Sequence, residues 1–224
     1  VTIAGAIQLL WLLFHVGRAG IKLRLRIPRF TAPIRTMLWR IMPAAVGAGV
    51  YQISLLVDTV IASLLTTGSI SYLFFADRVN QLPMGMIGVA VGTALLPMLS
   101  RQLSAGDSAT AIQTQNKAID ITLFLSLPAA AALIVIAEPT ISALFERGAF
   151  GLGETRATSS ALAVYATGLP AYVMVKVITP AYFAREDTST PVKIGLLAVL
   201  VNLVLNLVLI GPFQLLGIAA ATSA

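Results

Sequence analysis

Long apolar segments constrain this sequence more than any other feature. From Pro43 to Leu65 the only charged residue is Asp58. A helix over this segment would be about 34 Å long at 1.5 Å per residue, and the hydrocarbon core of a bilayer is about 30 Å thick. The whole chain is 58% hydrophobic and 11% charged, whereas a soluble domain has about 25% charged residues. The sequence therefore predicts an all-α protein, a polytopic bundle of transmembrane helices.

We expect seven spans, of which the outer two are incomplete. They cover 1–16, Pro43–Leu65, Val79–Leu99, Ile119–Ala137, Thr158–Phe183 and Pro191–Ile210, and the seventh begins near Phe213. Both ends of the sequence lie in apolar runs, which suggests part of a longer membrane protein. A short interfacial helix is predicted within 138–156, ending at Gly148, because glycine commonly follows a helix end.

Basic residues are distributed unevenly between the predicted loops. The segment 17–42 is the most basic, and on the same predicted side follow Arg101 with Lys117 and Arg185 with Lys193. The opposite side has only Arg78, Arg147 and Arg156. The positive-inside rule places the first group in the cytoplasm and makes 17–42 a basic cytoplasmic linker. Because topology explains the net charge of +6, we expect no nucleic-acid partner.

Asp58 lies near the middle of the second span, where a carboxylate costs at least about 2.5 kcal/mol to insert. On a helix it shares a small, polar face with Gly47, Tyr51, Ser54 and Ala62. The side chain should therefore face a bundle or cavity. It could form a cation or proton site, or it could only hydrogen-bond a neighbouring helix; an intramembrane acid favours the functional interpretation.

Two asparagines, Asn202 and Asn206, lie four residues apart in the otherwise apolar sixth span. Their amide oxygens, the Asp58 carboxylate and the Thr222 hydroxyl would form a set of hard oxygen ligands, suited to a cation such as Na⁺. Hydrogen bonding between helices explains the same spacing equally well.

Two basic residues are candidates for contact with an anionic substrate. Arg78 follows Asp77 at the predicted outer end of the third span, where a local ion pair or a rim charge is the simpler explanation. Lys176 lies inside the fifth span and can snorkel, pair with an acid or face a cavity. Gly88 and Gly92 form a GxxxG pattern, which predicts close helix packing.

Nothing in the sequence predicts an enzyme. There is no cysteine, so thiol catalysis and iron–sulfur sites are excluded. The GxSxG, HExxH, Walker A and Rossmann glycine patterns are also absent.

Three sequence strings together resemble one family. They are LLVDTVIASLLTTGSISYLFFADRVNQLPMGMIGVAVGTALLPMLSR, LFERGAF and ATGLPAYVMVKVITPAYFAREDTSTPVKI. The combination of ADR-x-x-x-x-P, G-V-A-x-G-T and Y-F-A-R-x-D-T-x-T-P-V is similar to the MurJ (MviN) lipid II flippases, which belong to the multidrug/oligosaccharidyl-lipid/polysaccharide (MOP) exporter superfamily together with the MATE exporters.

The resemblance implies a fold of fourteen transmembrane helices with two six-helix lobes around a cavity. Residues 1–16 would end the last helix of the first lobe, and 43–224 would form most of the second lobe. The implied function is alternating access that moves undecaprenyl-pyrophosphate-linked muropeptide (lipid II) to the outer leaflet of the bacterial inner membrane. The implied partners are lipid II and membrane lipids, and the transporter would be a monomer completed by its first lobe.

The resemblance also assigns residues. Arg78 matches the ADR arginine, implied to contact substrate, and Lys176 is a second candidate. Asp58, Asn202, Asn206, Thr222 and the backbone carbonyl of Ile218 match a sodium site. Some family members have an acid where this sequence has Asn206, so a proton at Asp58 is an alternative to Na⁺.

Two other functions stay open from the sequence. One is a MATE-like, cation-coupled drug exporter. The other is a membrane scaffold that binds a lipid-linked precursor without transporting it.

Overall fold

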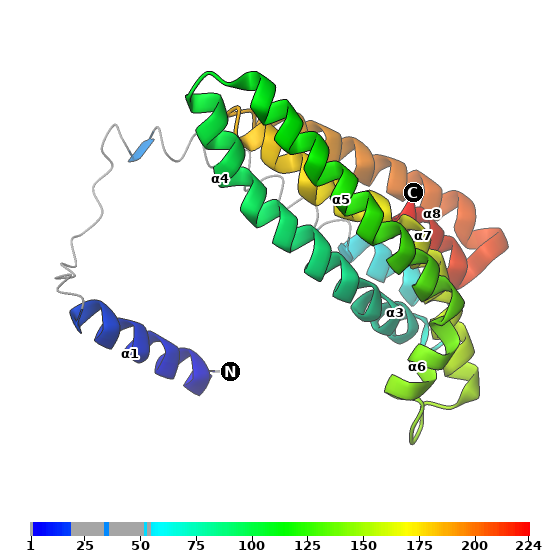
Figure 1. Ribbon diagram of the computed structural model, residues 1–224. Coiled ribbons are helices and arrows are strands. Elements are labelled where there is room, and N and C mark those ends of the chain that lie inside the picture. Colours follow the sequence, from blue (N-terminus) through cyan, green and yellow to red (C-terminus); the bar gives the residue numbers. More distant parts are fainter. Residues whose placement is uncertain (1, 19–33, 36–51, 53–54) are drawn as a thin grey trace. The chain divides into compact units, whose positions relative to one another are not determined.

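The computed structural model describes residues 2–18, 34–35, 52 and 55–224, and it divides the chain into the units Val1–Trp39 and Arg40–Ala224. In the first unit, helix α1 (Thr2–Arg18) covers the first predicted span (Figure 1). The predicted linker 17–42 and the beginning of the second predicted span fall mainly outside the described residues.

The described part of the second unit is helical and contains no strand (Figure 1). A helix over residues 55–63 is followed by α3 (Ser69–Met84), the π-helix η1 (Gly85–Val89), α4 (Ala90–Ser104), α5 (Ser108–Val135), α6 (Ala137–Phe145), α7 (Leu152–Phe183) and α8 (Ser189–Ser223). Among the described residues, four segments are long and apolar enough to cross a membrane: Ser69–Ser104, Ser108–Val135, Leu152–Phe183 and Ser189–Ser223. The predicted all-α membrane fold is confirmed.

The third span begins earlier than the sequence predicted. The preceding helix ends at residue 63, and a turn over 64–68 leads into α3 at Ser69 instead of Val79. Gly68 occupies the left-handed region with φ of 98°, which costs glycine no steric strain. Asp77 and Arg78 therefore lie inside α3 and not before a helix that starts at Val79.

Helix α7 is the central element of the second unit, since it packs against α3, α4, α5, α6 and α8. Leu162, Leu169, Val173 and Val177 on α7 have no exposed surface. Large apolar side chains elsewhere, such as Phe124 on α5, point out of the bundle. A chain that is apolar inside and outside matches a bundle surrounded by lipid.

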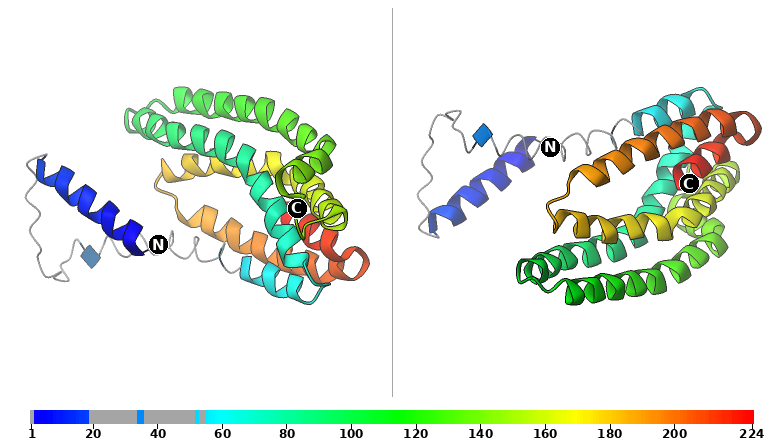
Figure 2. Two further views of the ribbon diagram at one scale, coloured as in Figure 1. Left: turned by 90° about the horizontal axis from the view of Figure 1, so that it is seen from below. Right: turned by 90° about the horizontal axis from the view of Figure 1, so that it is seen from above.

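The predicted sixth and seventh spans are the two arms of α8. The helix is interrupted at Gln214, whose φ of 47° and ψ of −118° are not helical. Figure 2 shows the chain reversing here, so that the orange arm and the red arm lie side by side. A Cβ atom on Gly217 would lie 2.4 Å from the carbonyl oxygen of Leu209, so a glycine is required where the arms approach.

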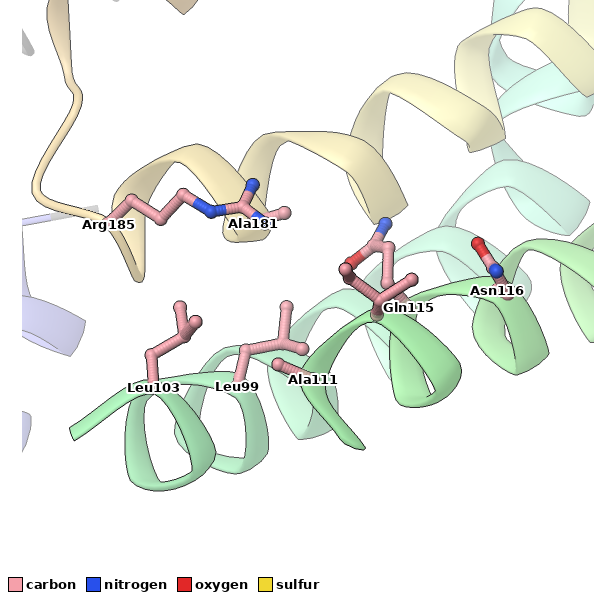
Figure 3. A pocket seen from close by; sticks show the side chains of 8 residues that line it. Leu99, Leu103, Ala111, Gln115, Asn116, Ala181 and Arg185 are labelled. Atoms are coloured by element: carbon pink, nitrogen blue, oxygen red, sulfur yellow. The ribbon is translucent and has the colours of Figure 1, made fainter. Parts of the chain in front are cut away.

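The α4–α5 turn and the α7–α8 turn lie at the same end of the bundle. Figure 3 shows Leu103 of α4, Gln115 of α5 and Arg185 after α7 around one small pocket. This placement confirms that the loops 101–117 and 185–193 share one side, as the charge pattern predicted. Their location in the cytoplasm stays a prediction.

Aspartates begin the helices at this end. Asp107 accepts a hydrogen bond from the backbone N–H of Thr110, and Asp187 accepts from those of Ser189 and Thr190. Hydrogen bonds from Thr110 and Thr190 respectively lower the pKa of each carboxyl group below its ordinary value. Both helices therefore have a local start signal.

The predicted short helix is present as α6, but it ends at Phe145 instead of Gly148. Gly148 lies in the following turn with φ of 63°. The rings of Phe145 and Phe150 both pack against Phe75 of α3, and these contacts hold the α6–α7 connection against the bundle.

Candidate functional site

Three segments that are distant in the sequence bring the predicted cation-binding residues together. Asp58 comes from the helix over 55–63, Asn206 from the first arm of α8, and Thr222 from the second arm. The reversal at Gln214 is what returns Thr222 to the level of Asn206. The α8 hairpin therefore builds the site.

The side chains of this cluster are linked by hydrogen bonds. Asn206 Nδ2 donates to Asp58 Oδ1 at 2.7 Å and to Asn202 Oδ1 at 3.1 Å. Thr222 Oγ1 lies 2.9 Å from the carbonyl oxygen of Ile218 and 3.5 Å from Asp58 Oδ2. Asp58 therefore has partners from both arms of α8, and the predicted grouping of five residues is observed.

The cluster has the donor chemistry of a site for a hard, monovalent cation. It offers carboxylate, amide, hydroxyl and carbonyl oxygens but only one acid, and the described residues contain no group of three acidic, histidine or cysteine side chains that would suit a transition metal. Asn206 has no exposed surface, and its Oδ1 atom is buried without a donor. This oxygen is a further potential ligand once the amide is rotated, and the oxygens of Asp58, Asn202 and Thr222 already fit Na⁺.

Helix α7 fixes the position of Thr222. The Tyr172 hydroxyl donates to the backbone carbonyl of Thr222, and Ser223 Oγ donates to the carbonyl of Val164 at 3.2 Å. A Cβ atom on Gly168 would lie 2.8 Å from the carbonyl oxygen of Ser223. The end of α8 is thus held directly against the backbone of α7.

Arg78 is exposed on α3, and its guanidinium is positioned by neighbours on the same helix. Its Cζ atom lies 4.8 Å from the centre of the Phe74 ring, within the range of a cation–π interaction. Its Nη1 atom donates to Gln81 Oε1 at 3.4 Å, a long hydrogen bond, and Gln81 Nε2 donates to Asp77.

No hydrogen bond joins Arg78 to Asp77 directly, because Gln81 lies between them. The ion-pair interpretation is therefore replaced by an amide bridge. The bridge also explains how two charged residues remain inside an apolar helix. The sequence interpretation missed Gln81 and Phe74, although spacings of three and four residues on a helix would have placed both next to Arg78.

Lys176 is exposed on α7; its aliphatic stem packs against Gly88 and its backbone against Gly92, the two glycines of the predicted GxxxG pattern. A Cβ atom on Gly88 would lie 3.2 Å from Lys176 Cγ, and one on Gly92 would lie 2.8 Å from the Lys176 carbonyl oxygen. The predicted close packing is confirmed. Lysine and arginine side chains are both donors and cannot hydrogen-bond each other, so a joint contact of Lys176 and Arg78 with a substrate stays a prediction.

Comparison with known proteins identifies the family. The family model described as "Lipid II flippase MurJ" matches residues 1–224. The probable lipid II flippase MurJ of Rhizobium meliloti (strain 1021) is 45% identical over 218 residues, which cover 97% of this chain and 41% of the relative. The Vibrio cholerae relative of the same name is 37% identical over 229 residues, covering 100% of this chain and 42% of the relative.

Solved structures agree with the sequence comparison. A lipid II flippase MurJ in an inward closed conformation matches with a TM-score of 0.76 and 32% identity, covering 88% of this chain and 42% of that one. An outward-facing MATE family transporter of the MOP superfamily has a TM-score of 0.71 at 19% identity, with 83% and 41% coverage, and shares the fold. This chain spans less than half the length of these relatives. It belongs to the MurJ lipid II flippase family and is a multi-pass protein of the bacterial inner membrane.

Proposed function

We propose that this chain forms part of a flippase that moves lipid II from the cytoplasmic to the outer leaflet. The family match over the whole chain supports this function. The relatives that carry the name lipid II flippase are more similar in sequence than the MATE neighbour, whose likeness is one of fold. The substrate would be the undecaprenyl-pyrophosphate-linked muropeptide, and no enzymatic step is part of the proposal.

The observation that carries the proposal is the arrangement around Arg78. An exposed guanidinium is held over Phe74 and by Gln81, within a segment long enough to span a membrane. Guanidinium groups bind phosphate oxygens through paired, charge-assisted hydrogen bonds. Arg78 would contact the pyrophosphate of the substrate, and Lys176 would add a second positive charge.

The Asp58 cluster would bind the coupling cation. Asp58, Asn202, Asn206, Thr222 and the Ile218 carbonyl would hold Na⁺, which supplies a positive charge to the half-buried carboxylate. A cation drives transport only if it binds two conformations with different affinity. The two arms of α8 contribute ligands from either side of the break at Gln214, so a change in the angle between them would alter that affinity. A proton on Asp58 is the alternative.

The substrate proposal is tested by binding to a chimera in which this chain replaces the matching segment of the Rhizobium meliloti relative. The Arg78→Ala change should weaken the binding of lipid II in nanodiscs about tenfold to a hundredfold, since a hydrogen bond to a charged group contributes about 1.5–3 kcal/mol. Arg78→Lys should fall between Arg78→Ala and the unmodified chimera, because lysine keeps the charge and loses the paired geometry.

Arg147→Ala is the matched control, because it removes the same charge from an exposed position in the α6–α7 connection. Equal affinities for Arg78→Ala and Arg147→Ala would contradict a role for Arg78 in substrate binding.

A further inference from the structure

The side-chain amide of Asn206 is the most constrained polar group in the Asp58 cluster. It has no exposed surface. Both hydrogens of its NH₂ group are used, one for Asp58 at 2.7 Å and one for Asn202 at 3.1 Å. Its carbonyl oxygen is buried without any donor. A buried acceptor without a donor is unfavourable, so the same oxygen is both destabilising as it stands and available as a ligand.

The amide has two orientations that occupy nearly the same space. Rotation by 180° about the Cβ–Cγ bond exchanges the oxygen and nitrogen, and this torsion has broad, roughly two-fold preferences. After rotation, Asn206 Oδ1 would face the oxygens of Asp58 and Asn202. Three oxygens that face one another repel unless a cation lies among them. The orientation with Nδ2 toward Asp58 and Asn202 therefore suits a cluster without a cation, and the rotated orientation suits a cluster that holds one.

We propose that Asn206 is a cation-dependent switch and determines the cation affinity of the cluster. Without a cation, its NH₂ group satisfies Asp58 and Asn202. When a monovalent cation such as Na⁺ binds, the amide turns and Oδ1 becomes a ligand. This inference rests on the proposed cation site and extends it, because it states which group changes and why the cation-free cluster is stable.

Other residue types at this position would behave differently. An aspartate would place a second carboxylate against Asp58 with no amide donor, so the cation-free cluster would be repulsive and the need for a cation greater. A leucine of similar volume would provide neither donor nor ligand. Of these three residue types, only asparagine both satisfies the carboxylate without a cation and provides an oxygen ligand, which makes the affinity moderate.

The first test is thermal unfolding of the purified chain in nanodiscs at pH 7.5, titrated with NaCl against choline chloride at constant ionic strength. The wild-type chain should be stabilised specifically by Na⁺. Asn206→Asp should reach half of its stabilisation at an Na⁺ concentration about tenfold lower, because no amide hydrogen bonds are displaced. Asn206→Leu should show no Na⁺-specific stabilisation.

The possible outcomes distinguish an error in the proposed cation site from an error in the proposed role of Asn206. If neither the wild type nor Asn206→Asp responds to Na⁺, the proposed cation site is wrong and the switch with it. If the wild type responds and Asn206→Leu responds equally, the site stands and the role of Asn206 is overturned. Half-saturation of Asn206→Asp at the wild-type concentration or above would also overturn it.

The second test does not depend on how the variants fold. Infrared difference spectra of the wild-type chain, with the asparagine side-chain carbonyls labelled with ¹³C, compare NaCl with choline chloride. A carbonyl that gains a cation absorbs at lower frequency than one without a partner. We expect a band at the frequency of a partnerless carbonyl, as Asn206 has, to move to lower frequency. This shift should be half complete at the Na⁺ concentration that gives half of the thermal stabilisation. Na⁺-specific stabilisation without a shifted asparagine band would overturn the rotation of the amide.

Discussion

At the scale of single residues, both candidate sites depend on amide side chains that accompany a charged group. Gln81 bridges Asp77 and Arg78 within α3, and Asn206 links Asn202 on its own arm of α8 to Asp58 on another helix. The second bridge could be anticipated, because polar residues in an apolar helix must find partners. The first was missed because the Asp77–Arg78 pair was taken as the boundary of a span, although its neighbours satisfy it inside the helix.

Gln214 has a strained backbone conformation, so the effect of replacing it with glycine can be predicted. Its φ of 47° and ψ of −118° match the first central position of a type II′ turn, which strongly favours glycine. Gln214→Gly should raise the free energy of unfolding by about 1 kcal/mol, because relief of backbone strain exceeds the added entropy of the unfolded chain. Chemical denaturation of the purified chain measures the change, and a lower stability of the variant would contradict the assignment of strain.

At the scale of secondary-structure elements, composition and spacing predicted the helices well and their boundaries less well. The break in α8 at Gln214 lies close to the predicted start of a span at Phe213, because Gly211 and Pro212 interrupt the apolar run. The start of α3 at Ser69 was not predicted. The π-helix Gly85–Val89 after Pro83 was not predicted either, since proline signals a disturbed helix but not the form that the helix takes.

Close packing between α4 and α7 depends on Gly92. A Cβ atom there would lie 2.8 Å from the backbone carbonyl oxygen of Lys176, which cannot move without shifting α7. Gly92→Ala should therefore destabilise the chain by about 1–3 kcal/mol. Gly85→Ala is the control, because a Cβ atom at Gly85 would meet nothing within 4 Å. Equal denaturation midpoints for the two variants would show that this approach of the helices does not contribute to stability.

Asp107 and Asp187, the aspartates at the starts of α5 and α8, should make the stability of the chain decrease at acid pH. The pKa of each carboxyl group is lowered by hydrogen bonds in the folded state. Their contribution is therefore complete above the unfolded pKa of about 3.9 and is lost as the pH falls through the lower, folded-state pKa. The double variant Asp107→Asn, Asp187→Asn keeps capping side chains that do not titrate.

The melting temperature of the double variant should thus fall less than that of the wild type between pH 5 and pH 3. Parallel decreases for the two proteins would contradict a role for these carboxylates in acid sensitivity. The comparison needs no assumption about transport.

At the scale of the whole molecule, the order of the apolar segments predicts the fold. The sites depend in addition on contacts between segments that are far apart in the sequence. The shared end of the loops 101–117 and 185–193 could be predicted from charge alone. The cluster of Asp58 with Thr222 needed the reversal of α8, and that reversal could be expected only as a boundary between two spans. Whether Arg78 and Lys176 meet at one site could not be predicted, because it depends on how α3 and α7 are rotated.

The most direct test of the proposed function is growth of a strain depleted of its own lipid II flippase. The chimera with the Rhizobium meliloti relative should support growth, and so should its Arg147→Ala variant. Its Arg78→Ala variant should fail to support growth although it is present in the membrane at the same level. Normal growth with Arg78→Ala would contradict the central claim that the positioned guanidinium on α3 binds the lipid-linked substrate.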